Sequence, residues 1–176
     1  GDEQVEFAIR SERLAELGAP LPELPSPAAV GHRYQDQIGA LLEARPPVFS
    51  FVFGIPAPAV LEACRARGIV TVGAATSIAE ARALEDAGVG AIVATGFEAG
   101  GHRPSFLARP EDSLMGTFAL TQLVSRRVRM PVAAAGGIVD ERGVRAALAL
   151  GAHGVQVGTA FLACEESGAR PEHRAR

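Results

Sequence analysis

From Pro46 onward the chain alternates short apolar runs with amphipathic segments, and this alternation constrains the fold more than any other feature. The apolar runs predict five β-strands, at residues 48–53, 69–73, 91–94, 131–135 and 154–157. The segments between them have the apolar spacing and the terminal residues of helices. Strands that alternate with helices at such short spacing predict repeated βαβ units around a parallel sheet.

Local signals mark where the helices between the strands begin. Pro58 suits a first helical position, and Ser77 with Glu80 forms a capping box. Asp140 is expected to cap the helix before the last strand. Asp112 is expected to cap a longer helix whose apolar residues are Leu114, Phe118, Leu120 and Val124.

Two parallel α/β architectures compete for this pattern, an open doubly wound sheet and a (β/α)₈ barrel. Barrels often bind phosphate with the loops after their last two strands plus a short extra helix. Here Gly136-Gly137 and Gly158-Thr159 end the last two strands, and residues 161–166 could form that helix. No GxGxxG motif follows a first strand, as a dinucleotide-binding fold would require. We therefore predict a TIM-type barrel, incomplete in this chain, with about five C-terminal βα units.

The first 45 residues are too few for the three missing βα units. Residues 5–17 could form a helix that ends at Gly18, and a proline-rich linker at residues 20–27 follows. Residues 32–44 are helix-like, with Ile38, Leu41 and Leu42 on one side. We therefore divide the chain into an N-terminal helical or linker segment, residues 1–45, and a barrel portion, residues 46–176.

Composition and charge exclude several classes of protein. The net charge is −3 and the basic residues are scattered, which argues against nucleic acid as a partner. No apolar run has the length of a membrane span, and the N-terminus has no signal-peptide pattern. Cys64 and Cys164 lie far apart, without metal-ligand spacing. We expect a cytoplasmic protein that binds no metal, with self-association left open.

The stretch AIVATGFEAGGHRP, residues 91–104, carries the strongest chemical signal. A buried strand is followed by Gly100 and Gly101, which lack Cβ atoms and allow a ligand close to the backbone. They present His102, whose imidazole can exchange a proton near neutral pH. A solvated histidine in a tight turn is the alternative. Glu98 could be a base or could bind backbone N–H groups of the turn, and Arg103 could attract an anion or be solvated.

Four segments together resemble the nitronate monooxygenase family, formerly called 2-nitropropane dioxygenases, which are FMN-dependent (β/α)₈ enzymes. They are SFVFGIP at residues 50–56, TGFEAGGHRP at residues 95–104, the long run from PVAAAGG to GTAFL at residues 131–162, and the trailing CEES. Their order and spacing also match. The resemblance implies FMN as the cofactor, and a small nitronate or nitroalkane together with O₂ as the substrates.

Carried over by position, the resemblance makes His102 the active-site histidine that faces the flavin. It places Gly100, with Gly101 beside it, against the cofactor. It assigns the FMN phosphate to the backbone of Gly137 and to Gln156, Val157, Gly158 and Thr159. Glycine-bearing strand ends, Gly136 included, suit an anionic phosphate because their N–H groups are unencumbered. Tight strand-to-helix geometry is the alternative for Gly136 and Gly158, and Gln156 could instead face the barrel interior.

The chain also departs from the family pattern. Thr95 stands where many relatives have a glutamine that contacts the flavin, and Pro104 stands where a glycine is common. The leading interpretation is an oxidoreductase that uses FMN and O₂ to oxidise alkyl nitronates. The alternatives are a flavin-dependent enoyl-thioester (enoyl-ACP) reductase of the same superfamily and a catalytically silent barrel fragment.

Overall fold

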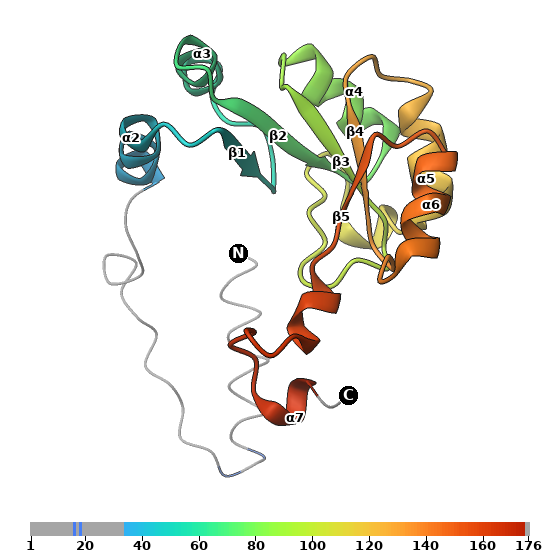
Figure 1. The fold of residues 1–176 in the computed structure, drawn as a ribbon. Helices are drawn as coiled ribbons and strands as arrows, with labels where there is room; N and C mark the ends of the chain where they lie inside the picture. Colours follow the sequence, from blue (N-terminus) through green and yellow to red (C-terminus); the bar gives the residue numbers. More distant parts are fainter. Residues whose placement is uncertain (1–15, 17, 19–33, 175–176) are drawn as a thin grey trace. The chain divides into compact units, whose positions relative to one another are not determined.

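The computed structural model describes Glu16, Gly18 and residues 34–174, except for the side chain of His173. The chain divides into two compact units, residues 1–37 and 38–176. The helix and linker expected within residues 5–27 lie outside the described residues, apart from Glu16 and Gly18. The fold below is that of the second unit (Figure 1).

The described residues contain a five-stranded sheet in which every neighbouring pair is parallel and the strand order is β1-β2-β3-β4-β5. The strands are β1 Val48–Phe51, β2 Val70–Ala75, β3 Ala91–Thr95, β4 Val132–Ala135 and β5 Gly154–Gln156. All five lie where the sequence predicts them, and each strand end agrees with its prediction within two residues. The prediction of a parallel α/β sheet is therefore confirmed, while closure into a barrel stays a prediction.

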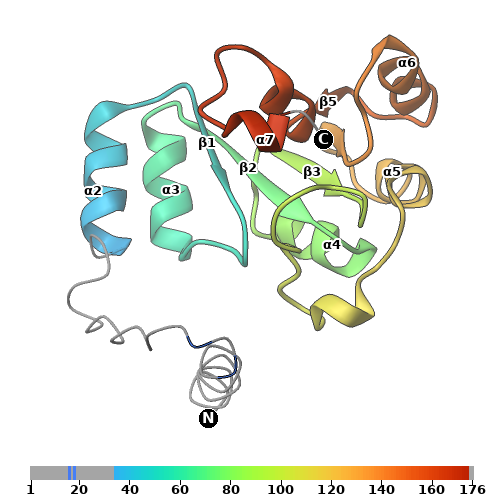
Figure 2. The same cartoon turned by 90° about the horizontal axis from the view of Figure 1, so that it is seen from below.

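Helices connect successive strands, and further helices precede β1 and follow β5. They are α2 Tyr34–Ala44, α3 Pro58–Ala66, α4 Ile78–Asp86, α5 Thr117–Ser125, α6 Glu141–Ala149 and α7 Pro171–Arg174, with two 3₁₀ helices, η1 Pro110–Asp112 and η2 Thr159–Ala163. Helices α3 to α6 pack on the sheet in chain order, α3 and α4 on β2, α5 on β3 and β4, and α6 on β5. Figure 2 shows them as an arc along one side of the strands. Sequential strands with all crossover helices on one side have the topology of a barrel wall.

The core lies between this arc of helices and the sheet. Its fully buried side chains include Leu84 of α4, Ile92 of β3, Leu120 of α5 and Val132 of β4. On β1 the burial alternates along the strand, so that one set of side chains faces the helices and the other does not. The opposite face of the sheet is open, and Val48, Ser50, Val72, Val93 and Ala133 line a hollow of about 720 Å³ there.

Two predicted helix caps are confirmed and one is wrong. The Ser77 hydroxyl accepts a hydrogen bond from the Glu80 N–H at 3.2 Å, and the Asp140 carboxylate accepts one from the Gly143 N–H at 2.9 Å. Asp112 caps no helix, because it ends the 3₁₀ helix η1, and α5 begins only at Thr117. Of the apolar residues expected on that helix, Leu114 lies before it and Phe118 is 64% exposed.

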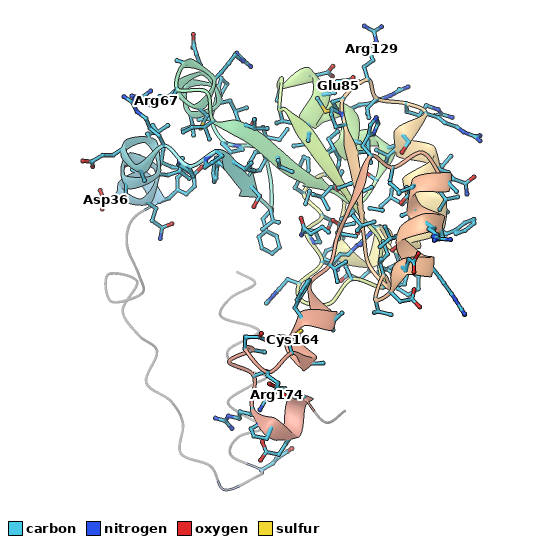
Figure 3. All side chains as sticks on the ribbon, viewed as in Figure 1. Asp36, Arg67, Glu85, Arg129, Cys164 and Arg174 are labelled. Atoms are coloured by element: carbon cyan, nitrogen blue, oxygen red, sulfur yellow. The ribbon has the colours of Figure 1, made fainter. Side chains whose placement is uncertain are left out.

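At the edge of the sheet opposite the predicted site, helix α4 holds the loop before β4. Glu85 of α4 accepts a hydrogen bond at 2.7 Å from the backbone N–H of Arg129, in the loop before β4 (Figure 3). This contact ties that loop to α4. Within residues 34–174, no helix combines the length and the apolar character needed to cross a membrane.

Candidate functional site

The carboxyl ends of β3, β4 and β5 lie level with one another. In the ladder, Thr95 of β3 pairs with Ala135 of β4, and Ala135 pairs with Gln156 of β5. The loops that follow these three residues therefore emerge from one edge of the sheet. A cavity of about 770 Å³ opens at this edge, within the usual range for small-molecule pockets.

All ten site residues predicted from the sequence line this one cavity. They are Thr95, Gly100, Gly101, His102, Gly136, Gly137, Gln156, Val157, Gly158 and Thr159. Residues up to 64 positions apart are thus brought together by the parallel register of the strands. Gln156 also lines the hollow on the open sheet face, so it lies at the border between the two spaces. The geometry brings the residues together, whereas their roles stay predictions.

Gly136 and Gly158, which follow the ends of β4 and β5, are present for different physical reasons. Gly136 has a φ of +118°, and a Cβ there would lie 2.6 Å from the Thr117 hydroxyl and 2.9 Å from the Ala99 nitrogen. Its place is therefore set by packing as well as by conformation. A Cβ on Gly158, by contrast, would meet no atom of the described residues within 4 Å. Tight geometry explains Gly136, but it does not explain Gly158.

The cavity presents backbone donors that the protein leaves free. Among the described residues, the N–H groups of Gly137 and Gly158 donate to no other protein group, and both residues are exposed. The Thr159 hydroxyl lies beside Gly100 in the same cavity, because a Cβ on Gly100 would approach it to 2.5 Å. Free N–H groups and a hydroxyl, with open space in front of Gly158, fit the phosphate of a nucleotide-like cofactor.

His102 stands at the mouth of the cavity in the loop after β3. Its side chain is exposed, and its ring lies edge-on to the Phe53 ring with 6.3 Å between the centroids. Phe53 itself has a φ of +63°, a left-handed conformation that is costly for an aromatic residue and that often marks functional sites. The predicted strand at residues 48–53 ends at Phe51 for this reason, and Val52 and Phe53 join the cavity wall.

Glu98 lines the cavity, but its carboxylate holds the start of α5. It accepts hydrogen bonds from the Thr117 N–H at 2.8 Å and from the Thr117 hydroxyl at 2.9 Å. Burial would raise the pKa of the Glu98 carboxyl, but hydrogen bonds from its own N–H and from Thr117, with the charge of Arg103, hold that pKa below its ordinary value. A carboxylate so engaged is a poor base. It does bind a backbone N–H, but that N–H belongs to Thr117 at the start of α5 and not to the turn that the sequence suggested.

Arg103 is neither solvated nor directed into the cavity. Its guanidinium donates to the carbonyl oxygen of Thr95 at 2.6 Å, to the hydroxyl of Ser113 at 3.3 Å and to the carbonyl oxygen of Ser113. Arg103 is half-buried and does not line the cavity. It therefore fastens the chain directly after His102, and both interpretations from the sequence are wrong.

Glu80 is a site-related residue that sequence reasoning misses. It is 0% exposed, and its carboxylate accepts hydrogen bonds from the N–H groups of Phe106 and Leu107 in the loop that carries His102. The sequence identifies it only as half of a capping box, since its loop partners lie 26 and 27 residues further on. No local signal predicts a contact at that separation.

The fold and the site together define a class of protein. Parallel strands with their crossover helices on one side, and a ligand-sized cavity at the carboxyl ends of the strands, are typical of β/α proteins that bind a ligand at that edge. Residues 20–176 match the family model described as nitronate monooxygenase. The chain belongs to the nitronate monooxygenase family, as the resemblance implied.

Individual relatives agree with this assignment. The chain is 49% identical over 130 residues to a nitronate monooxygenase from Paraburkholderia phytofirmans, covering 74% of this chain and 36% of the relative. It is 50% identical over 134 residues to one from Pseudomonas aeruginosa, covering 76% and 38%. The crystal structure of a nitroalkane oxidase from Streptomyces ansochromogenes superposes with a TM-score of 0.85 at 38% identity, covering 98% of this chain and 50% of that one. The chain thus spans well under two thirds of the length of these proteins.

Proposed function

We propose that this chain forms the flavin-binding part of an FMN-dependent oxidoreductase that oxidises alkyl nitronates with O₂. The observation that carries the proposal is the shared cavity, in which His102 and the free N–H groups of Gly137 and Gly158 lie at one edge of the sheet. A proton-transferring group and an anion-binding corner are the two parts that such a reaction needs from the protein.

The phosphate of FMN is assigned to the corner made by Gly137, Gly158 and Thr159. Backbone N–H groups bind an anion without a lysine, and the space before Gly158 admits phosphate oxygens. Gly100 and Gly101 leave room for the ring system beside His102. Thr95 lines the same cavity, but its hydroxyl donates to the Val93 carbonyl oxygen at 3.3 Å and is only a weak substitute for a glutamine amide.

His102 is assigned the proton transfer. With a neutral nitroalkane, its imidazole accepts the proton from the carbon that bears the nitro group, which leaves the nitronate anion in the cavity. With a preformed nitronate this step is already complete. Bound flavin supplies the electron transfer between the nitronate and O₂, and the protein supplies orientation and the base.

The complete site is proposed to need the rest of the barrel. The named relatives are more than twice as long as the aligned region, and the open sheet face leaves Val48 52% exposed. We propose that further strands continue the sheet at β1 and β5 and cover this face, which would close the barrel. The cytoplasmic location and the oligomeric state stay predictions.

The proposal is tested on a complete enzyme that contains this sequence, by oxygen consumption with FMN and two substrates, a neutral nitroalkane and its preformed nitronate. We expect His102→Asn to reduce the rate with the nitroalkane by about 10² to 10⁴ and the rate with the nitronate far less. His153→Asn is the matched control, since His153 lies outside the cavity and is expected to leave both rates unchanged. Equal losses on both substrates would exclude His102 as the base.

The same assay separates the alternative functions. An enoyl-thioester reductase would consume NADPH in the presence of an enoyl thioester and would not consume O₂ with a nitronate. A catalytically silent fragment would do neither with FMN present. Oxidation of the nitronate without NADPH consumption supports the proposal over both alternatives.

A further inference from the structure

We propose that Glu80 is a positioning residue for His102, and that its buried carboxylate holds the loop that places the imidazole at the cavity. The catalytic part of this inference rests on the proposed function, whereas the structural part does not. Glu80 does not line the cavity, so any effect on catalysis must pass through the groups that it binds, which are Thr76 and the loop.

The carboxylate of Glu80 joins two segments that are distant in the chain. Oε2 accepts hydrogen bonds from the Thr76 N–H at 2.7 Å and from the Thr76 hydroxyl at 2.6 Å. Oε1 accepts from the N–H groups of Phe106 at 2.6 Å and Leu107 at 3.0 Å. One oxygen thus binds the end of β2, and the other binds the loop after His102.

This arrangement differs from an ordinary helix cap. In a capping box the glutamate at this position returns to the N–H of the cap residue, here Ser77. The Glu80 side chain binds Thr76 instead and uses its second oxygen for two N–H groups outside the helix. Helix formation alone would not need that second oxygen, so the contact to the loop has a separate purpose.

The loop is fastened on both sides of His102. Before the histidine, Glu98 binds Thr117 of α5. After it, Arg103 binds Thr95 and Ser113, and Glu80 binds the loop three residues further on. Among the described residues, residues 100–102 make no hydrogen bond of their own, so these flanking contacts and the edge-on contact with the Phe53 ring position the imidazole. Pro104, the departure from the family pattern, is buried between the two later contacts.

The function of Glu80 requires its charge. Its four partners are all donors, and only an ionised carboxylate accepts from all of them. Burial would raise the pKa of the Glu80 carboxyl, but the hydrogen bonds from Thr76, Phe106 and Leu107 outweigh it and hold that pKa below the ordinary value. A glutamine would direct its NH₂ group at two of these donors. The hydrogen bonds either to Thr76 or to Phe106 and Leu107 would then be lost.

The test uses the full chain with the substitution Glu80→Gln and the matched control Glu85→Gln. Glu85 lies on the same helix and also binds one backbone N–H, that of Arg129, but at the opposite end of the sheet. The first measurement is amide hydrogen exchange, which needs neither FMN nor substrate. We expect exchange at Phe106 and Leu107 to become at least about tenfold faster in Glu80→Gln and to stay unchanged in Glu85→Gln.

The second measurement is kinetic. Displacement of a catalytic group by about 1 Å can cost on the order of 10² in rate, so we expect a 10- to 100-fold loss of kcat with the neutral nitroalkane, with little change in KM. The rate with the preformed nitronate should change far less. In a His102→Asn background, Glu80→Gln should add no further loss with the nitroalkane, because the group it positions is already gone. Glu80→Asp, which keeps the charge on a shorter side chain, should lie between Glu80→Gln and the unchanged protein, and it serves if Glu80→Gln does not fold.

The outcomes separate this inference from the proposed function. If a complete enzyme that contains this sequence oxidises neither substrate, the proposed function fails, and hydrogen exchange alone decides whether Glu80 holds the loop. Unchanged exchange at Phe106 and Leu107 overturns the inference. Equal losses on both substrates, or a further loss in the His102→Asn background, show that Glu80 acts on the fold as a whole and also overturn it.

Discussion

Glu98 offers the clearest test of how the loop after β3 is held. We consider Glu98→Gln, which keeps the size of the side chain and removes its charge. The carboxylate lies at the N-terminus of α5, where it accepts from both the N–H and the hydroxyl of Thr117. The amide of glutamine can retain one of these bonds through its oxygen, so the charge is the main loss.

The magnitude follows from two contributions. An N-terminal cap is worth about 0.5–2 kcal/mol, of which glutamine retains a part. A charge at a helix N-terminus is worth about 0.3–1 kcal/mol, and partial exposure of Glu98 places it toward the lower end. We therefore expect a loss of about 1 kcal/mol in the free energy of unfolding at pH 7. For a chain of this length that corresponds to a decrease of about 2–4 °C in Tm.

The pH dependence distinguishes charge from shape. The pKa of Glu98 is lowered in the folded protein, so its stabilising effect is present above the unfolded value near 4.3 and is lost as the pH falls through the folded value. The difference between the unchanged protein and Glu98→Gln should therefore shrink below pH about 4. Urea unfolding at pH 7 and at pH 4 or below measures it, with Glu111→Gln as an exposed control in the following segment that should change little. A difference that is absent at pH 7, or equal at both pH values, would refute this account of Glu98.

Two changes in the core test the packing of α4 on β2. Leu84→Ala removes a fully buried side chain and should cost about 2–5 kcal/mol in urea unfolding. Gly73→Ala places a Cβ 2.4 Å from Cδ2 of Leu84 and should cost about 1–3 kcal/mol through overpacking. Gly73→Ala should cost less in the Leu84→Ala background than alone, because the Leu84 side chain that clashes with the new Cβ is absent there. If the two losses in unfolding free energy were strictly additive, this packing would be contradicted.

The sequence predicts the strands and most helix ends because their causes are local. Strand positions follow from short apolar runs. Ser77 and Asp140 each cap a helix by accepting a hydrogen bond from the backbone N–H three residues further along the chain. The ten site residues also come together as predicted, because parallel strands place their carboxyl ends at one edge of the sheet.

The failures have non-local causes. The helix expected after Asp112 begins later, where Glu98 caps Thr117 from 19 residues earlier in the chain. The functions of Glu80 and Arg103 depend on partners that only the folded loop brings near. Phe53 leaves its strand because its backbone turns to a positive φ, which the apolar run VFSFVF does not indicate.

The central claim is that the ends of β4 and β5 form the phosphate corner of a flavin site. The most direct test is a fluorescence titration with FMN and with riboflavin, which lacks the phosphate, on the unchanged protein, Gly158→Ala and Gly154→Ala. Within the part of the chain that the structure describes, a Cβ meets no atom within 4 Å at either glycine, but Gly154 lies outside the cavity. We predict that the unchanged protein and Gly154→Ala bind FMN more tightly than riboflavin, and that Gly158→Ala loses this preference. Equal binding of FMN and riboflavin by the unchanged protein, or an unaltered preference in Gly158→Ala, would contradict the claim.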